Sequence, residues 1–297
     1  MIGGTLKVQT GSPQPKNGAD PILKLDVVPL RHYGQWAVST ILVALLASLA
    51  IALARNENIH YPTIVEFFAA DVVLRGLITT FQLTIIGMIA GVLIGVGVAV
   101  AKMSENRVLR LLAGGYIWLF RGVPLLVQIL IWGNFALLFP RLGIGIPFTD
   151  VMLFQVDTNV VITTLVAGAL ALALHEGAYM AEVVRGGILS VDLGQREAAT
   201  ALGMTSTMAM RRIILPQALR TIIPPTGNQF ISLLKASSLI AIISGHDLMS
   251  TVQNISAQNY RTIEMLLVAS LWYLIIVTLL NFLQSKLEKR LSRSVSR

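Results

Sequence analysis

Cysteine is absent from the sequence, histidine is rare, and no nucleotide-binding signature occurs. Without cysteine the chain has no disulfide, no thiol nucleophile and no cysteine-ligated zinc. The run that begins at His175 and Glu176 has no second histidine four residues after the first, which excludes the zinc-protease motif. The P-loop pattern of glycine, four residues, Gly-Lys and Ser or Thr is also missing. We therefore expect no metal and no bound ATP on this chain.

Charge is scarce as well. Only 13% of the 297 residues are charged, whereas 55% are hydrophobic and the mean hydropathy is +0.72. No soluble core needs so much apolar sequence, so the composition predicts a polytopic membrane protein. The net charge of +8 is a weak sign of nucleic-acid binding, because the basic residues gather beside apolar runs. There they would meet anionic lipid headgroups, and no nucleic-acid partner is expected.

Six apolar runs are each close to the roughly 20 residues that cross a bilayer core as a helix. The predicted spans are 36–54, 76–101, 122–140, 158–174, 221–245 and 265–285. The predicted fold class is therefore all-α. Residues 1–35 are polar and are expected to form a flexible tail, and the first apolar run comes too late for a conventional cleaved signal peptide.

Two local patterns within these spans predict how the helices behave. Gly87, Gly91 and Gly95 recur every four residues, which predicts a seam where another helix approaches closely. Pro224 and Pro225 lack backbone N–H groups and are expected to break the fifth span near its inner end. Such breaks are tolerated where protein or a water-filled cavity satisfies the freed carbonyls.

The distribution of Lys and Arg predicts the orientation. With both termini in the cytoplasm, the inner segments 1–35, 102–121, 175–220 and 286–297 carry 18 of the 23 basic residues. The outer loops then carry four, and Lys235 lies within a span. The positive-inside rule therefore predicts that both termini and the segment around Glu197 are cytoplasmic.

The segment 192–216 is the longest polar stretch between two spans and has clear local signals. Asp192 is a candidate N-cap, with Gln195 as its capping-box partner. Gly203 is suited to a left-handed helix stop, and Pro216 to the first turn of the next helix. A short helix with a ridge of small residues, held between spans, is shaped to lie in a groove on another protein.

This segment resembles the cytoplasmic coupling loop of ABC importer permeases. The family pattern is EAA, three residues, glycine, nine residues and I-x-LP. Every position of it is met here, by Glu197, Ala198, Ala199, Gly203, Ile213, Leu215 and Pro216. The resemblance implies that the loop docks on a separate ATPase subunit, which binds ATP and Mg²⁺.

Two further runs are similar to permeases for polar amino acids. The run FRGVPLLVQ contains Arg121, Gly122, Pro124 and Gln128, and a later run contains Glu182 and Arg185. Arg121 is either a headgroup-level anchor or part of the family motif. Glu182 and Arg185 lie three residues apart on one helix face and are expected to pair, with a direct role in transport as the alternative.

Polar residues inside the spans are candidates for the substrate path, because an ionisable group is costly in a membrane. The candidates are Gln128, Glu176, Asn228 and Lys235. Glu176 either makes an interhelical or interfacial contact or meets a cationic group of the substrate, whether an α-amino group or a basic side chain. Lys235 either meets a carboxylate or pairs with an acid on a neighbouring subunit.

The resemblance, which covers about residues 70–290, implies a five-helix type I importer domain preceded by an extra helix at 36–54. It also implies two ATPase subunits, a second permease subunit (identical or homologous) and an extracytoplasmic solute-binding protein. The predicted function is the permease of a bacterial inner-membrane amino-acid importer, not an enzyme. The alternatives are the same fold importing another small zwitterion or an opine-like amine, or an ion-coupled secondary transporter. Secondary transporters favour internal repeats, which this sequence lacks.

Overall fold

The computed structural model describes residues 33–145 and 152–292, which fall into two units, Met1–Glu57 and Asn58–Arg297. The first unit contains one described helix, α1 (Tyr33–Ala54), whose 22 residues include no charge. That length is sufficient to cross a bilayer core. The tail predicted for 1–35 lies outside the described residues, except that its last three residues form the first turn of α1.

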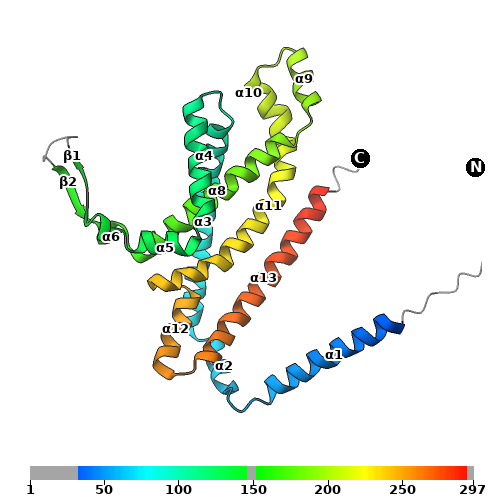
Figure 1. Cartoon of the computed structure of the whole chain (residues 1–297), viewed down its shortest axis with the longest axis vertical. Coiled ribbons are helices and arrows are strands. Elements are labelled where there is room, and N and C mark those ends of the chain that lie inside the picture. The colour runs from blue at the N-terminus through cyan, green and yellow to red at the C-terminus, as the bar shows by residue number, and fades with distance from the viewer. Residues whose placement is uncertain (1–32, 146–151, 293–297) are drawn as a thin grey trace, which may run out of the picture. The chain divides into compact units, whose positions relative to one another are not determined.

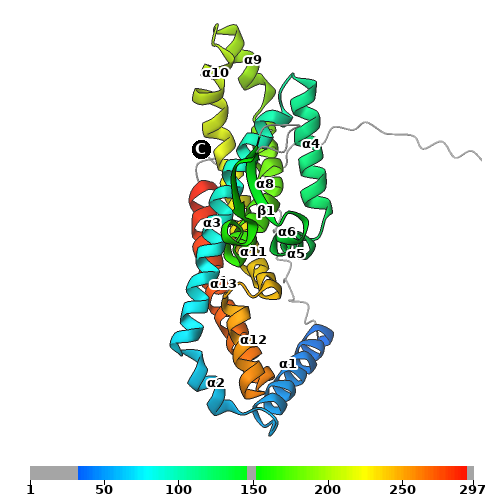
Figure 2. The ribbon, with the colours of Figure 1, turned by 90° about the vertical axis from the view of Figure 1, so that its left-hand side faces the viewer.

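The second unit, called the core unit below, is helical apart from one β-hairpin. Its elements are α2 (Tyr61–Phe68), α3 (Asp71–Lys102), α4 (Arg107–Gly122), α5 (Leu125–Gly133), α6 (Phe135–Leu138), β1 (Arg141–Gly145), β2 (Met152–Asp157), α7 (Thr158–Val161), α8 (Thr164–Leu189), α9 (Leu193–Ala201), α10 (Ser206–Ala209), the π-helix η1 (Met210–Ile214), α11 (Leu215–Ala236), the 3₁₀-helix η2 (Ser237–Ile243), α12 (Leu248–Asn259) and α13 (Thr262–Ser292). Within the core unit, α9 and α10 lie at one end, and α2 and α12 lie at the opposite end (Figures 1 and 2).

The described residues contain four helices long and apolar enough to cross a membrane, or six spans if each of two bent helix pairs is one span. The prediction of about six spans agrees with the larger number. The second and sixth spans, predicted at 76–101 and 265–285, are extended in the structure to the full lengths of α3 and α13. The antiparallel hairpin β1–β2 and the short helices α2 and α12 were not predicted.

The predicted glycine seam joins α3 to α8. A Cβ atom built at Gly91 would lie 2.8 Å from the Cβ of Glu176, and one built at Gly95 would lie 2.6 Å from the Cβ of Met180. A Cβ atom built at Gly87 would lie equally close to the Cβ of Leu172 on α8. The seam prediction is confirmed, and the absence of these side chains is what lets the two backbones approach.

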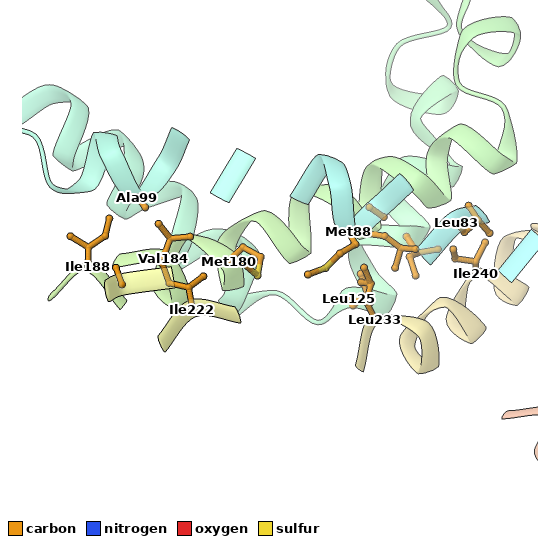
Figure 3. Packing of buried hydrophobic residues seen from close by; sticks show 14 of the residues in the cluster. Leu83, Met88, Ala99, Leu125, Met180, Val184, Ile188, Ile222, Leu233 and Ile240 are labelled. Atoms are coloured by element: carbon orange, nitrogen blue, oxygen red, sulfur yellow. The ribbon is translucent and has the colours of Figure 1, made fainter. Parts of the chain in front are cut away.

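Helix α8 is the centre of the core unit, since it contacts α3, α4, α5 and α11. One cluster of buried apolar side chains joins α3, α8 and α11. In Figure 3, Leu83, Leu233 and Ile240 lie toward one end of this cluster, and Val184, Ile188 and Ile222 lie toward the other. A second cluster joins α3, α11, α12 and α13 around Val73, Leu234, Leu248, Val252 and Met265.

The third span is bent rather than straight, which corrects the prediction of one helix at 122–140. Helix α4 ends at Gly122, α5 begins at Leu125, and the two helices are bent by 98°. Pro124 has no N–H and disfavours a helical conformation at the preceding residue, so the chain turns there. Helix α4 also occupies most of the predicted inner segment 102–121, and Asn106 caps it by accepting from Val108 N at 2.9 Å.

The fourth span is displaced along the sequence from its predicted place at 158–174. Residues Thr158–Val161 form the separate short helix α7, and α8 continues to Leu189. The apolar run ends at His175, but the helix does not, because His175 and Glu176 face other parts of the protein rather than lipid. The helix was predicted to continue through His175 and Glu176, and this is confirmed; the start of the helix, at Thr164 instead of Thr158, is the part of the prediction that was wrong.

The predicted break at Pro224 and Pro225 is wrong, because α11 continues through both prolines. Side chains bond to backbone carbonyls at this point of the helix: Gln284 Nε2 donates to Pro224 O at 2.8 Å, and Thr226 Oγ1 donates to Ile222 O at 2.8 Å. The departures from α-helical geometry lie at the two ends of α11, in η1 and η2.

The seam yields a direct test. Gly95→Ala should lower the stability of the purified protein by about 1–3 kcal/mol, because the new methyl group would overlap α8. Its nearest neighbours would include the backbone N of Ala181 at 2.9 Å, which cannot move aside easily. The measurement is the thermal unfolding midpoint in detergent. The control is Gly97→Ala on the same helix, where a Cβ has no neighbour within 4 Å. Equal thermal unfolding midpoints for Gly95→Ala and Gly97→Ala would contradict close packing of α3 against α8 at Gly95.

Candidate functional site: coupling segment and polar groove

The coupling segment, residues 192–216, folds from the local signals that predicted it. Asp192 is the N-cap of α9, and its Oδ1 accepts a hydrogen bond from Gly194 N at 2.6 Å. Helix α9 ends at Ala201, and Gly203 has a left-handed backbone with φ of +70°. Leu215 and Pro216 open α11. The expected helix, turn and second helix are confirmed.

Two side-chain hydrogen bonds connect α9 to α8 and to α11. Arg196 Nη2 donates to Ile188 O at 2.9 Å, in the last turn of α8. Gln195 does not form the expected capping box; its Oε1 accepts from Gln217 Nε2 of α11 at 3.5 Å instead. Sequence reasoning missed both contacts, because nothing local marks them. They connect α9 to the two helices on either side of it in the chain.

The outer face of α9 is exposed and mixed in character. Glu197 and Ala198 are exposed, whereas Ala199 is buried. Leu193 and Leu202 are 71% and 79% exposed, which is a large apolar area for a polar loop. The other pattern residues, Ile213, Leu215 and Pro216, lie where η1 passes into α11, and Leu215 and Pro216 are exposed. Large exposed apolar side chains on a polar segment are typical of a surface that binds another protein.

Gln128 closes the bend between α4 and α5. Its Nε2 lies 3.0 Å from Phe120 O, 2.8 Å from Val123 O and 3.2 Å from Nδ1 of His175. The side chain is buried, and the two carbonyls that it caps are left without helical partners by the turn at Pro124. The side-chain N–H groups of Gln128, a candidate for the substrate path, are therefore already hydrogen-bonded to backbone carbonyls.

Two adjoining hollows lie between α8 and α11 and share the side chains of Tyr179 and Gln229. We call them together the polar groove. The deep hollow has a volume of about 220 Å³ and the wide hollow about 400 Å³. The deep hollow is also lined by His175, Glu176 and Ser232, and the wide hollow by Arg121, Glu182 and Asn228. Residues from two separate sequence motifs and from α11 therefore converge on one face of the core unit.

Charges in the wide hollow are partnered. Arg185 donates to Glu182 Oε2 through Nε at 2.9 Å and Nη2 at 2.6 Å, which is the expected local pair. The guanidinium carbon of Arg121 lies 5.1 Å from the ring centroid of Tyr179, a cation–π contact. Tyr179 lies on α8 about 15 Å before the C-terminal end of that helix. Because Arg121 contacts the ring of Tyr179, its guanidinium is also well away from the C-terminal end of α8.

The remaining candidates differ in position. Glu176 is only 3% exposed, and its Oε1 accepts no hydrogen bond from the described residues. Lys235 is exposed in the last turn of α11 and lines neither hollow. Gly122 ends α4, and Pro124 precedes α5, so both belong to the bend. No group of three or more His, Asp or Glu that could hold a metal occurs within 33–145 and 152–292.

Sequence reasoning missed Tyr179, Gln229 and Ser232. A signal for them was present, because the groove residues recur at helical spacing on both helices. They are 175, 176, 179, 182 and 183 on α8, and 225, 228, 229, 232 and 236 on α11. Such a stripe becomes visible only when α8 and α11 are known to face each other, which the sequence alone does not show.

These features define a helical, multi-pass membrane protein with a folded polar segment between two spans, and comparisons with known proteins give its family. The family model described as "Binding-protein-dependent transport system inner membrane component" matches residues 87–293. The chain therefore belongs to that family and is a permease subunit of an ABC importer, in which ATP hydrolysis takes place on a separate subunit. Family membership removes the ion-coupled transporter as an alternative.

Two individual relatives and one solved structure are similar to this chain in sequence over most of their length. The chain is 40% identical to the "Arginine transport system permease protein ArgU" of Corynebacterium glutamicum, over 92% of this chain and 85% of that protein. It is 40% identical to the "Putative glutamine transport system permease protein GlnP" of Rickettsia bellii, over 74% and 92%. The "Crystal structure of an amino acid ABC transporter with histidines" contains a chain 36% identical, with a TM-score of 0.67, over 78% and 99%.

The extent of these matches separates the two units. The ArgU match covers 274 residues, which is longer than the core unit Asn58–Arg297 and so includes part of the first unit. The GlnP match covers 219 residues and spans nearly all of that relative. At least part of the N-terminal unit therefore has a counterpart in ArgU.

The role of Gln128 can be tested by removing its donors. Gln128→Leu should lower stability by about 1–3 kcal/mol, because it strands the carbonyls of Phe120 and Val123. The measurement is again the thermal midpoint in detergent. Asn134→Leu is the matched control, since the exposed Asn134 amide bonds only to Leu130 O of the preceding turn. A stable Gln128→Leu protein that has lost transport would instead favour a direct role in the path.

Proposed function

We propose that this chain lines the translocation path for a polar amino acid and receives ATP-driven motion through residues 192–216. The observation that carries the proposal is the attachment of α9 to both helices that form the polar groove. Arg196 bonds to the end of α8, and Gln195 bonds to α11 near its start. A displacement of α9 would therefore reach both walls of the groove.

The substrate class rests on relatives and on groove chemistry. The relatives named above are an arginine permease, a putative glutamine permease and an amino-acid transporter structure. The groove offers cationic, anionic and amide groups in Arg121, Glu182, Asn228 and Gln229, which suit a small zwitterion. The same scaffold could carry an opine-like amine or another zwitterion, and competition for uptake between such solutes and amino acids distinguishes these cargoes.

The assembly we propose has two ATPase subunits, a second permease subunit and an extracytoplasmic solute-binding protein. The second permease is either an identical copy or a homologue. ATP and Mg²⁺ are held by the ATPase subunits. ATP binding would close the ATPase pair, α9 would follow that movement, and the groove would open outward; hydrolysis would reset it. ATP shifts the equilibrium because it binds the closed ATPase pair preferentially.

Docking of α9 is tested by co-purification. The exposed carboxylate of Glu197 lies in the middle of the exposed face of α9. Glu197→Lys should therefore reduce recovery of the ATPase subunit from detergent-solubilised membranes by about tenfold or more. Glu105→Lys, at another exposed carboxylate, is the control and should leave recovery unchanged. Equal recovery with both variants would refute docking through α9.

Gly203→Pro should likewise uncouple ATP hydrolysis from uptake while leaving membrane insertion intact.

The orientation, with both termini cytoplasmic, is supported by the distribution of basic residues and has its own test. Because the chain has no cysteine, a single introduced thiol reports only its own position. A membrane-impermeant maleimide should label Glu66→Cys, on α2, in intact spheroplasts. It should label Glu105→Cys, between α3 and α4, only after permeabilisation. The reverse pattern would invert the topology.

A further inference from the structure

A larger hollow lies between α3 and α11, over a second face of α8. It has a volume of about 710 Å³, and we call it the apolar groove. Its lining includes Val184, Ile188 and Ile222, which Figure 3 shows at one end of the buried cluster. The apolar groove shares no residue with the polar groove, so the two hollows lie on different sides of α8 and α11.

The lining of the apolar groove is suited to hydrocarbon. None of its side chains is charged, and the two polar ones are Ser104, just after α3, and Thr226, far along α11. The hydroxyl of Thr226 donates to Ile222 O at 2.8 Å, so its hydrogen-bonding capacity is used within α11. A polar amino acid placed here would lose its hydration and gain no partner along most of the groove.

The length of the groove matches one leaflet of a bilayer. On α3 the lining runs from Val92 to Met103, a rise of about 16 Å, and on α11 it runs from Leu215 to Thr226, which is also about 16 Å. The hydrocarbon core of a bilayer is about 30 Å thick, so one leaflet spans about 15 Å. The groove is open to its surroundings along Val96, which is 44% exposed on the candidate span α3. An acyl chain of one leaflet can therefore lie along it.

The end of the groove beside the coupling segment has a positive charge. Met210 lines this end and is followed by Arg211 and Arg212 in η1. Both arginines are exposed, and neither takes part in the ion pairs found among the described residues. One carboxylate, Glu105, adjoins the lining residue Ser104, so the charge of these three groups together remains positive. A ligand with an anionic head and a long apolar tail fits both the charge and the lining.

We propose that the apolar groove binds one anionic phospholipid from the leaflet on the α9 side of the membrane. An acyl chain lies between α3 and α11, and the phosphate lies beside Arg211 and Arg212. An apolar helix, whether α1 or part of a second permease, would cover the lining but bring no anion to the arginines. Because η1 lies between α10 and α11, the bound lipid braces this part of the coupling segment against α3. The inference goes beyond the proposed function and does not depend on the cargo.

The test measures lipid bound to the purified permease–ATPase complex by native mass spectrometry. Dioleoyl phosphatidylglycerol is compared with dioleoyl phosphatidylcholine, which has the same acyl chains and no net charge. The wild type should bind phosphatidylglycerol with an affinity about tenfold or more above that for phosphatidylcholine. The double variant Arg211→Gln, Arg212→Gln should reduce this preference to about twofold or less. The control is Arg110→Gln, at an exposed arginine of α4 that adjoins no lining residue, and it should keep the preference.

A second variant acts on the lining and leaves the coupling segment unchanged. Val96→Trp would occupy part of the groove and should weaken binding of both lipids by about tenfold, because less of the acyl chain can then be buried. The matched control is Leu93→Trp, at a position of the same helix that is 70% exposed and does not line the groove. It should bind both lipids as the wild type does.

Several outcomes would overturn the inference. Equal affinity of the wild type for the two lipids would do so, as would an unchanged preference in the double arginine variant or equal binding by Val96→Trp and Leu93→Trp. Displacement of the lipid by glycerol phosphate, which has the headgroup charge and no acyl chain, would show that the arginines bind free phosphate alone. Each of these results would leave the proposed function standing.

The rival occupant, an apolar helix, is tested in membranes. Because the chain has no cysteine, Val96→Cys provides a single thiol for a photoactivatable label. Cross-linking of the label to phospholipid would support the proposal. Cross-linking to α1 or to a second permease subunit would show that a helix covers the groove and would refute it.

Discussion

The close contact between α3 and α8 is the interaction on which the rest of the core unit depends. In a bilayer, lipid tails are as apolar as leucine, so helices associate through close packing rather than through escape from water. Gly91 and Gly95 permit that packing because any side chain there would overlap Glu176 or Met180. With one side of α8 closed in this way, its other faces are left to α4, α5, α11 and the polar groove.

The same helix joins the groove to the coupling segment. Its middle presents Glu176 and Tyr179, and its last turn receives the hydrogen bond from Arg196 of α9. Helix α11 repeats the arrangement, with Gln217 near its start and Gln229 in the groove. A docking surface and a candidate path are thus two ends of the same two helices, which is what coupling by rigid elements requires.

The sequence predicted the local features of the site and failed where contacts are long-range. The N-cap at Asp192 and the stop at Gly203 involve residues within a few positions of each other, and both were predictable. The groove that His175 and Glu176 of α8 line was not predictable, because α11 forms its other wall. Both residues are tolerated because they line a groove in the protein, which no single-residue scale records.

The sequence by itself determined the membrane class, the number of apolar runs, the glycine seam and the shape of the coupling segment, because each depends on composition or short spacing. Only the tertiary structure decided the 98° bend that Gln128 closes, the continuation of α11 as one helix through Pro224 and Pro225, and the convergence on the groove. The physical reason is that these features depend on partners far along the chain. Gln284 reaches Pro224 O from 60 residues away, and Gln128 meets His175 from 47.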